Sequence, residues 1–457
     1  MRPPQDDRTA LWLWVACAAI GVMGLLAALC IAYSGHFPNL GRVGDLWFGA
    51  DISRHIRWVL QPDSQFRSHL HPGSFVLFKV WGFVLRALGI VPGMDTLVVF
   101  AVPVIMLTGI GMTVSVTLIV PSGPRSGIMR TAMLVLLLVV GPILIFGPMP
   151  ESHVLGGVAL LLQTALTWRL MHATAGGKVE PNTQRWTALA IVCAAVATAV
   201  TLSNLVPAAI LLLPVVWLHT LRGLLVRMAL AATAAAAVAV VGIFSVSVES
   251  FRLAPRLIRV VGYELRWLML PDRHSIGRSF EGLIVSEFGL PASALTTWQN
   301  PFTGLMVTSV GNLGVTGLQT AGCLAWCMGV LLWARTAGRG SPERSFLRYC
   351  LLAALSLIAF HSAYATDEAY LFSAHMWPYL VLPAVLAWTN GVRTGRVAPV
   401  VFITAAVAFS AVQTGVGLAG LRGLPPTTGQ RQAGTLIDST NLGRCLEIPH
   451  VKPSTKP

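Results

Sequence analysis

Long apolar stretches recur along almost the whole of this 457-residue chain. Hydrophobic residues make up 55% of it and charged residues only 11%, whereas soluble domains carry about 25% charged residues. An apolar run of roughly 20 residues is the length that an α-helix needs to cross the hydrocarbon core of a bilayer. The sequence therefore predicts an all-α fold, a polytopic transmembrane helical bundle, and excludes an ordinary soluble domain.

Eleven segments have the length and apolarity of spanning helices. The first is too long for the apolar core of a signal peptide, so we interpret it as a retained anchor. A further run, residues 73–91, carries Lys79 and Arg86 on one helical face, which favours a helix lying in the membrane interface. The predicted spans are residues 11–33, 95–120, 131–148, 152–171, 187–204, 206–221, 227–247, 304–334, 346–364, 370–390 and 397–418.

The positions of Lys and Arg orient these spans, because short cytoplasmic loops are enriched in both residues. If residues 73–91 do not cross, every short basic loop lies on the side of the N-terminus. The short turns on the other side, at 147–152, 203–206 and 365–369, contain no Lys or Arg. We therefore predict a multi-pass protein of the cytoplasmic (inner) membrane, with its N-terminus in the cytoplasm and its C-terminus outside.

This topology predicts one transmembrane domain, residues 1–418, with two long outer segments. The first, residues 34–94, is expected to contain interfacial helices, and the second covers residues 248–303. The tail, residues 419–457, is rich in Gly, Pro and Thr, which predicts an outer, weakly ordered segment. No internal repeat is visible, which disfavours a transporter built from duplicated halves.

The formal net charge of +14 does not indicate nucleic-acid binding, because the Lys and Arg residues lie in loops between apolar runs. There they set orientation or contact anionic membrane lipids. The seven cysteines are scattered, mostly within apolar runs, so they predict neither a disulfide framework nor a CxxC metal site.

The most polar stretch, residues 44–74, lies in the first outer segment. Asp51 begins the run DISRHIRWVL, in which it shares a face of a predicted short helix with His55. A carboxylate beside an apolar wall can serve as a base toward an incoming hydroxyl, and helix capping is the alternative role. His69 and His71 precede Pro72, a residue suited to a first helical turn. They could pair with an anionic group, remain solvated, or hold a divalent metal, the least favoured reading because HxH spacing is a weak metal signal.

Three further groups face the same compartment in this topology. Glu151 lies at the start of a predicted span, where a carboxylate either caps the helix or lines a cavity. Asp367 and Glu368 form a second acidic edge. An outer run carries basic and tyrosine side chains at steps of four and three, a stripe that could bind a lipid phosphate or anionic headgroups. The stripe comprises Arg252, Arg256, Arg259, Tyr263 and Arg266.

The order of these features over residues 1 to about 210 resembles the GT-C superfamily of integral-membrane glycosyltransferases. A first span precedes an outer loop in which Asp51 begins an interfacial helix. The loop ends in His71 and Pro72, where relatives often have Lys-Pro, and a second interfacial helix, two spans and an outer turn with Glu151 follow. The superfamily uses polyprenyl-phosphate sugars and includes protein O-mannosyltransferases and aminoarabinose transferases of lipid A. This chain departs from it in having a single Asp51 where paired acids are common, and in lacking a large soluble domain after the last span.

The resemblance implies a hexosyl- or pentosyltransferase that moves a sugar from a polyprenyl-phosphate carrier to a lipid or glycan acceptor at the outer membrane face. It implies that Asp51 is the base and that Glu151 lines the same cavity. It names no certain cofactor, and a divalent metal remains the less favoured possibility. The alternatives are a lipid-linked glycan ligase or polymerase, a transporter or flippase without glycosyl transfer, and a noncatalytic envelope scaffold. The expected substrate-binding residues are His69, His71, Arg256, Arg259, Tyr263, Arg266, Asp367 and Glu368.

Overall fold

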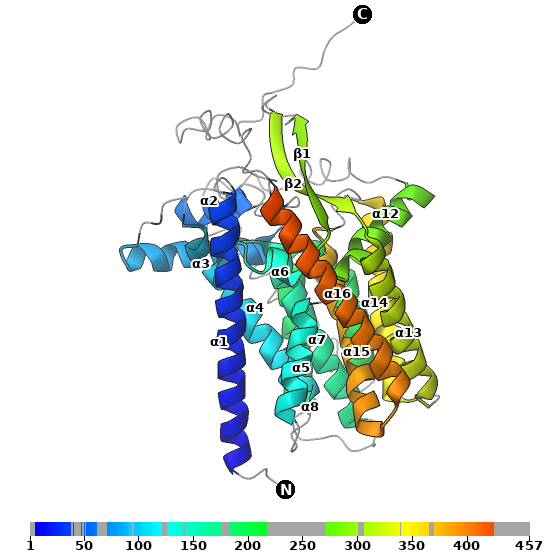
Figure 1. The fold of residues 1–457 in the computed structure, drawn as a ribbon. Helices are drawn as coiled ribbons and strands as arrows, with labels where there is room; N and C mark the ends of the chain where they lie inside the picture. Colours follow the sequence, from blue (N-terminus) through cyan, green and yellow to red (C-terminus); the bar gives the residue numbers. More distant parts are fainter. Residues whose placement is uncertain are drawn as a thin grey trace, which may run out of the picture.

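The computed structural model shows a bundle of helices that mostly run along one direction, with two shorter helices lying across one end (Figure 1). Within the part of the chain that it describes, seven helices are long and apolar enough to cross a membrane. The prediction of an all-α polytopic membrane protein is therefore confirmed. The structure describes residues 5–37, 40, 47, 50, 52–61, 71–90, 92, 96–120, 126–139, 142–174, 183–216, 270–299, 306–338, 340–364 and 370–424.

The long helices coincide with the predicted spans, except that the segment 227–247 lies outside the described residues. α7 is the central helix and packs against α4, α8, α9, α14 and α15. The seven long apolar helices are α1 (Gln5–His36), α4 (Leu97–Ile119), α7 (Ser152–Thr174), α8 (Thr183–Val200), α13 (Gly317–Thr336), α14 (Pro342–Ala363) and α16 (Val397–Gly423). Three more helices coincide with predicted spans, namely α5 (Ser126–Val139), α9 (Leu205–Val216) and α15 (Ser373–Thr394).

The two ends of the bundle differ in the residues that meet there. We call the end from which a two-stranded hairpin extends the hairpin end, and the opposite end the basic end (Figure 1). At the hairpin end, α1 finishes beside the end of α16, where His36 Nε2 lies 2.8 Å from the carbonyl of Leu424. At the basic end, Arg169 of α7 donates to the carbonyl of Leu118 in α4 at 3.2 Å, and His172 lies 3.3 Å from Glu343 of α14. The end of α4, the end of α7 and the start of α14 thus lie together at this end of the bundle.

α2 (Ile52–Leu60) and α3 (Pro72–Ala87) form the pair that lies across the hairpin end (Figure 1). The two cations of α3 hold the end of α2: Lys79 Nζ donates to the carbonyl of Gln61 at 2.6 Å, and Arg86 to that of Val59 at 3.0 Å. The last carbonyl groups of a helix have no N–H partner within that helix, so these two contacts satisfy them. The charges that suggested an interfacial helix therefore also join α3 to α2.

A two-stranded antiparallel sheet, β1 (Ala292–Gln299) and β2 (Met306–Gly314), extends from the hairpin end (Figure 1). The predicted span at 304–334 therefore began too early, because its first part is a strand. The sequence MVTSVGNLG contains the β-branched residues that strands favour, and Val310 is buried and bridges to Trp47 of the first outer segment. The helix itself begins after Thr316, which forms a capping box with Gln319.

Other boundaries differ from the predicted ones for local reasons. The predicted span 131–148 is interrupted, because Pro142 follows α5 and begins the short α6 (Ile143–Phe146). The last helix continues to Gly423, five residues past the predicted 418, because Leu421 is buried against the bundle. The remaining elements at the hairpin end are the 3-10 turn η1 (Leu202–Asn204), α12 (Arg273–Leu283) and the 3-10 turn η4 (Val285–Glu287).

Candidate functional site

A group of titratable side chains is buried at the hairpin end, around the start of α7. They come from α2, α3, α7, α14 and α15, and each is at most 8% exposed. Titratable residues at the ends of membrane helices are costly to bury, so such a convergence indicates a site. We call it the buried polar cluster, and it comprises Arg54, His55, His71, Glu151, His153, His361 and His375.

Glu151 directly precedes α7 and caps it. Its Oε1 accepts hydrogen bonds from Ser152 N at 2.6 Å, Ser152 Oγ at 3.0 Å and His153 N at 3.3 Å. A carboxylate here satisfies N–H groups that lack intrahelical partners and complements the positive end of the helix dipole. The capping role is thus confirmed for Oε1. The same atom lies 3.9 Å from His153 Nε2, which places the negative charge inside the cluster.

His71 precedes α3 as its N-cap residue, and Pro72 occupies the first turn as predicted. The Nδ1 atom of His71 lies 3.0 Å from the carbonyl oxygen of Val200 at the end of α8. A carbonyl only accepts, so Nδ1 carries the hydrogen and the lone pair is on Nε2. Burial first, and then the charge of Arg54 and the neighbouring histidines, lowers the pKa of His71 well below its usual value. At neutral pH this side chain therefore offers a lone pair and not a positive charge.

The rings of His71, His153 and His375 lie in a row, in edge-on and tilted contacts. The ring centroids of His71 and His153 are 5.6 Å apart, and those of His153 and His375 are 5.2 Å apart. Phe372 closes the row, with its centroid 4.7 Å from His153 and 4.1 Å from His361. The row thus joins the N-termini of α3, α7 and α15 with the C-terminus of α14.

Two adjacent glycines in the first turns of α7 make this packing possible. A Cβ on Gly156 would lie 2.7 Å from Asn204 Nδ2 and 3.0 Å from His375 Nε2. A Cβ on Gly157 would overlap the carbonyl group of Ala374. Without side chains at these positions, the start of α15 can lie directly against α7.

α2 contributes Arg54 and His55 to the cluster. Burial lowers the pKa of His55 to about 3, with Arg54 acting in the same direction and the Glu151 carboxylate acting against both. His55 packs on Phe78 of α3, with ring centroids 4.7 Å apart, and the guanidinium carbon of Arg54 lies 6.0 Å from the Trp58 ring. Because α2 begins at Ile52, the residue next to Asp51, its first turn lies at this cluster.

A second buried carboxyl, Glu287 of η4, lies at the same end of the bundle. Glu287 is 1% exposed, and neither of its carboxylate oxygens has a hydrogen-bond partner among the described residues. Burial raises its pKa well above the usual value. The surroundings therefore favour the protonated form of Glu287, which can donate one hydrogen bond.

The structure brings together two of the predicted site residues, Glu151 and His71, which come from separate helices and lie in one cluster. No ligand set of three or more His, Cys, Asp or Glu side chains for a metal ion is found in the described ranges. The other predicted residues lie outside the described part of the chain, namely Asp51, His69, Arg256, Arg259, Tyr263, Arg266, Asp367 and Glu368.

The sequence analysis missed Arg54, His153 and His361 as site residues. Arg54 follows Asp51 by three positions, a spacing that shares one face in a predicted helix, which is a usable signal. His153 and His361 each lie close to the end of an apolar helix, and a titratable residue in such a place is rare enough to be noted. Their meeting with His71 depends on contacts between distant segments.

Comparison with known proteins finds only distant similarity. No family model matches the chain, and no match is found among curated proteins. The chain is similar to the archaeal oligosaccharyltransferase AglB from Archaeoglobus fulgidus, solved with an inhibitory peptide and a dolichol-phosphate. The two are 12% identical with a TM-score of 0.42, over 92% of this chain and 57% of that one.

A crystal structure of the Archaeoglobus fulgidus oligosaccharyltransferase tethered to an acceptor peptide by a disulfide bond is similar to the same degree. Its identity is 13% and its TM-score 0.41, over 93% of this chain and 58% of that one. The chain thus spans a little over half the length of either structure. No residue correspondence follows from this degree of identity, so the site rests on its own contacts.

Proposed function

We propose that this chain is a membrane glycosyltransferase that transfers a sugar from a polyprenyl-phosphate carrier to a lipid or glycan acceptor at the outer face of the inner membrane. The observation that carries the proposal is the convergence of Arg54, His71 and Glu151 beside the helix that begins directly after Asp51. The order of elements also agrees with a GT-C-type arrangement: α1, the α2 and α3 pair, α4, α5, and an acid that caps α7.

The proposed chemistry needs a base and a group that stabilises the leaving phosphate. Asp51 accepts the proton of the acceptor hydroxyl while that oxygen attacks the anomeric carbon of the sugar. The bond between the anomeric carbon and the phosphate oxygen breaks, and polyprenyl phosphate leaves with the bonding electrons. Arg54 is the described cation nearest the start of α2, and a guanidinium binds phosphate oxygens through paired hydrogen bonds.

Glu151 and His71 fit positioning roles in this scheme. Oε1 of Glu151 accepts hydrogen bonds from the first N–H groups of α7. The carboxylate therefore fixes the start of that helix and the orientation of His153. The lone pair on His71 Nε2 can accept a hydrogen bond from a sugar or acceptor hydroxyl.

The location of the charges favours an enzyme over a transporter or flippase. Within the described spans, buried arginine and histidine residues lie close to helix ends: Arg130 near the start of α5, His361 near the end of α14 and His375 near the start of α15. Transporters place such groups near the bilayer midplane. Gln163 is buried further along α7, but its amide donates to the carbonyl of Ala208 at 2.7 Å, a helix-to-helix contact.

The proposal is tested with the purified protein in lipid nanodiscs, supplied with lipid-linked sugars and acceptors extracted from membranes of the source cell. Mass spectrometry measures the polyprenyl phosphate released, a readout that does not require the sugar to be known. Asp51→Asn is expected to lower release by about 10²- to 10⁴-fold, the usual contribution of a general base.

The matched control is Asp63→Asn, which removes another carboxylate of the same outer segment and is expected to leave release unchanged. Release that persists in Asp51→Asn would remove Asp51 as the base. An absence of release from the unmodified chain, together with movement of intact lipid-linked sugar between leaflets, would favour a flippase.

A further inference from the structure

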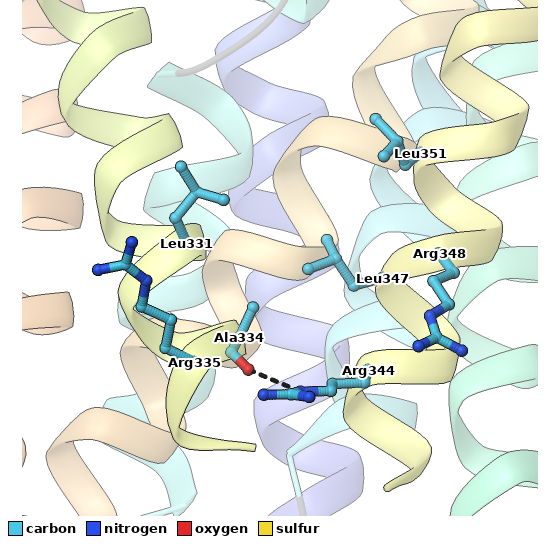
Figure 2. Close-up of a pocket in the computed structure, with 7 residues that line it drawn as sticks. All are labelled: Leu331, Ala334, Arg335, Arg344, Leu347, Arg348 and Leu351. Carbon is cyan, nitrogen blue, oxygen red and sulfur yellow. Dashed lines mark hydrogen bonds between the residues drawn. The ribbon is translucent and has the colours of Figure 1, made fainter. Parts of the chain in front are cut away.

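A groove with a basic mouth lies between α13 and α14 (Figure 2). It lies at the basic end of the bundle, and its volume is about 290 Å³. Three arginines and three leucines line it together with Ala334, and Arg344 lies between the two helices with Arg335 and Arg348 on either side. The lining residues are Leu331, Ala334, Arg335, Arg344, Leu347, Arg348 and Leu351.

The groove exists because two consecutive helices pack against different neighbours. α13 packs mainly along α16, whereas α14 packs along α9 and α12. Near the connecting turn the two helices are joined by one hydrogen bond, from Arg344 Nε to the carbonyl of Ala334 at 3.0 Å (Figure 2). Beyond it the leucines face each other across open space, and Leu331 and Leu351 are each 57% exposed.

The charge in the groove is uncompensated by its own lining. Three arginines and no acidic residue line it. The acid nearest in sequence, Glu343, instead pairs with His172 of α7 at 3.3 Å. A guanidinium has five N–H donors, so Arg344 retains its Nη donors for a ligand after the contact with Ala334.

A second groove shows what the arginines add. It lies between α1 and α4 and is apolar throughout, with Ile20, Met23, Val98 and Met106 among its lining residues. Such a surface suits any hydrocarbon chain. Only the groove between α13 and α14, of these two, combines apolar walls with a cationic mouth.

We propose that the groove between α13 and α14 binds an anionic phospholipid. The phosphate lies at Arg344, with Arg335 and Arg348 on either side of it, and one acyl chain lies along Leu331, Leu347 and Leu351. The arginines stand in the last turn of α13 and the first turns of α14, the level at which basic side chains meet headgroups, while the leucines continue toward the middle of the spans. The lipid would fill the space that the diverging helices leave. This proposal does not depend on the proposed glycosyl transfer.

Native mass spectrometry of the purified full-length protein tests it, with phosphatidylglycerol and phosphatidylcholine of identical acyl chains as probes. The unmodified protein is expected to retain phosphatidylglycerol in preference to phosphatidylcholine. The double variant Arg335→Gln, Arg348→Gln is expected to reduce bound phosphatidylglycerol about tenfold or more, since each basic residue at a headgroup adds to affinity. Arg393→Gln with Arg396→Gln, exposed arginines at the same end of the bundle, is the matched control and is expected to have no effect.

A second variant tests the acyl chain separately. Leu351→Trp keeps all three arginines but fills the groove, so bound phosphatidylglycerol should fall severalfold in that variant as well. Millimolar inorganic phosphate should not displace the lipid. Equal retention of the two lipids, equal loss in the control, no effect of Leu351→Trp, or displacement by inorganic phosphate would each overturn the proposal.

Discussion

A histidine that is buried beside an arginine and other histidines is held neutral, because desolvation and neighbouring positive charge both disfavour the imidazolium. His55 and His71 are in this state. The buried polar cluster therefore presents uncharged imidazoles next to one guanidinium, Arg54, and one capping carboxylate, Glu151. A phosphate bound in the cluster would contact the positive charge of Arg54, while the histidines would serve as neutral hydrogen-bonding groups.

This state predicts that stability falls in mild acid. The unfolded chain binds a proton on His55 near pH 6.5, whereas the folded chain binds it near pH 3. Between these values the unfolded state holds more protons, so stability is full above the unfolded pKa and is lost as the pH falls. The expected loss at pH 5 is about 2 kcal/mol for this one group, measured as a decrease in the Tm of the purified protein between pH 7.5 and pH 5.

The variant His55→Phe isolates this contribution, because a phenyl ring suits the aromatic surroundings of Trp58 and Phe78. Its Tm should fall less than that of the unmodified chain over the same pH range. His274→Asn, at an exposed position of α12, should keep the full slope. Equal slopes in all three proteins would contradict the buried, neutral state of His55.

At the scale of elements, the sequence predicted most helices because an apolar run of the right length has few other stable structures in a bilayer. It also predicted α2 and α3 as helices apart from the spans, from Asp51, Pro72 and the charges of α3. The β2 strand was missed because its apolar residues continue without a break into α13, so a hydropathy criterion joins the two. The pairing with β1 that makes it a strand is invisible in the run itself.

The histidine row could not be predicted from the sequence for a related reason. His71, His153 and His375 are separated by most of the bundle in sequence, and each alone resembles an ordinary helix-end residue. They meet because Gly156 and Gly157 let α15 approach α7. The sequence therefore located the end of the bundle and the acid Glu151, but the identity of its neighbours depends on helix packing.

The glycine pair gives a prediction for the α7 and α15 contact. In Gly157→Ala, the new methyl group would overlap the Ala374 carbonyl group, so α15 must shift away from α7. Overpacking of this kind costs about 1–3 kcal/mol, against which better helix propensity returns at most about 1 kcal/mol. We expect a lower Tm and less polyprenyl phosphate released, measured by scanning fluorimetry and by the release assay.

The matched control is Gly21→Ala in α1, where no atom lies within 4 Å of the added carbon. That variant should be neutral or slightly more stable, with unchanged release. If Gly157→Ala behaved in the same way, the close approach of α15 to α7 would not be required for the site.

At the scale of the whole molecule, the two ends of the bundle gather different residues. Arg169 of α7, Arg344 of α14 and Arg396 before α16 lie at the basic end, and Glu151 lies with the buried polar cluster at the other. The positive-inside rule predicts that the basic end faces the cytoplasm. The proposed topology then puts the candidate site on the outer side, where it would meet a sugar presented on a lipid carrier.

This orientation is testable with single cysteines in a Cys445→Ser background, since the other cysteines lie within the apolar helices. Glu281→Cys, on α12 at the hairpin end, should react with a membrane-impermeant maleimide in intact cells. Arg396→Cys, between α15 and α16 at the basic end, should react only after the membrane is permeabilised. Both side chains are exposed, and labelling of both from the same side would exclude the proposed topology.

The central claim, sugar transfer at the hairpin end with Asp51 as base, is tested most directly by the mass of the envelope glycans in a strain that lacks this gene. Re-expression of the unmodified chain should restore a glycan mass difference equal to one transferred sugar. Asp51→Asn, present in the membrane at equal abundance, should leave the glycans as they are in the deletion strain. Restoration of the full glycan mass by Asp51→Asn would contradict the claim.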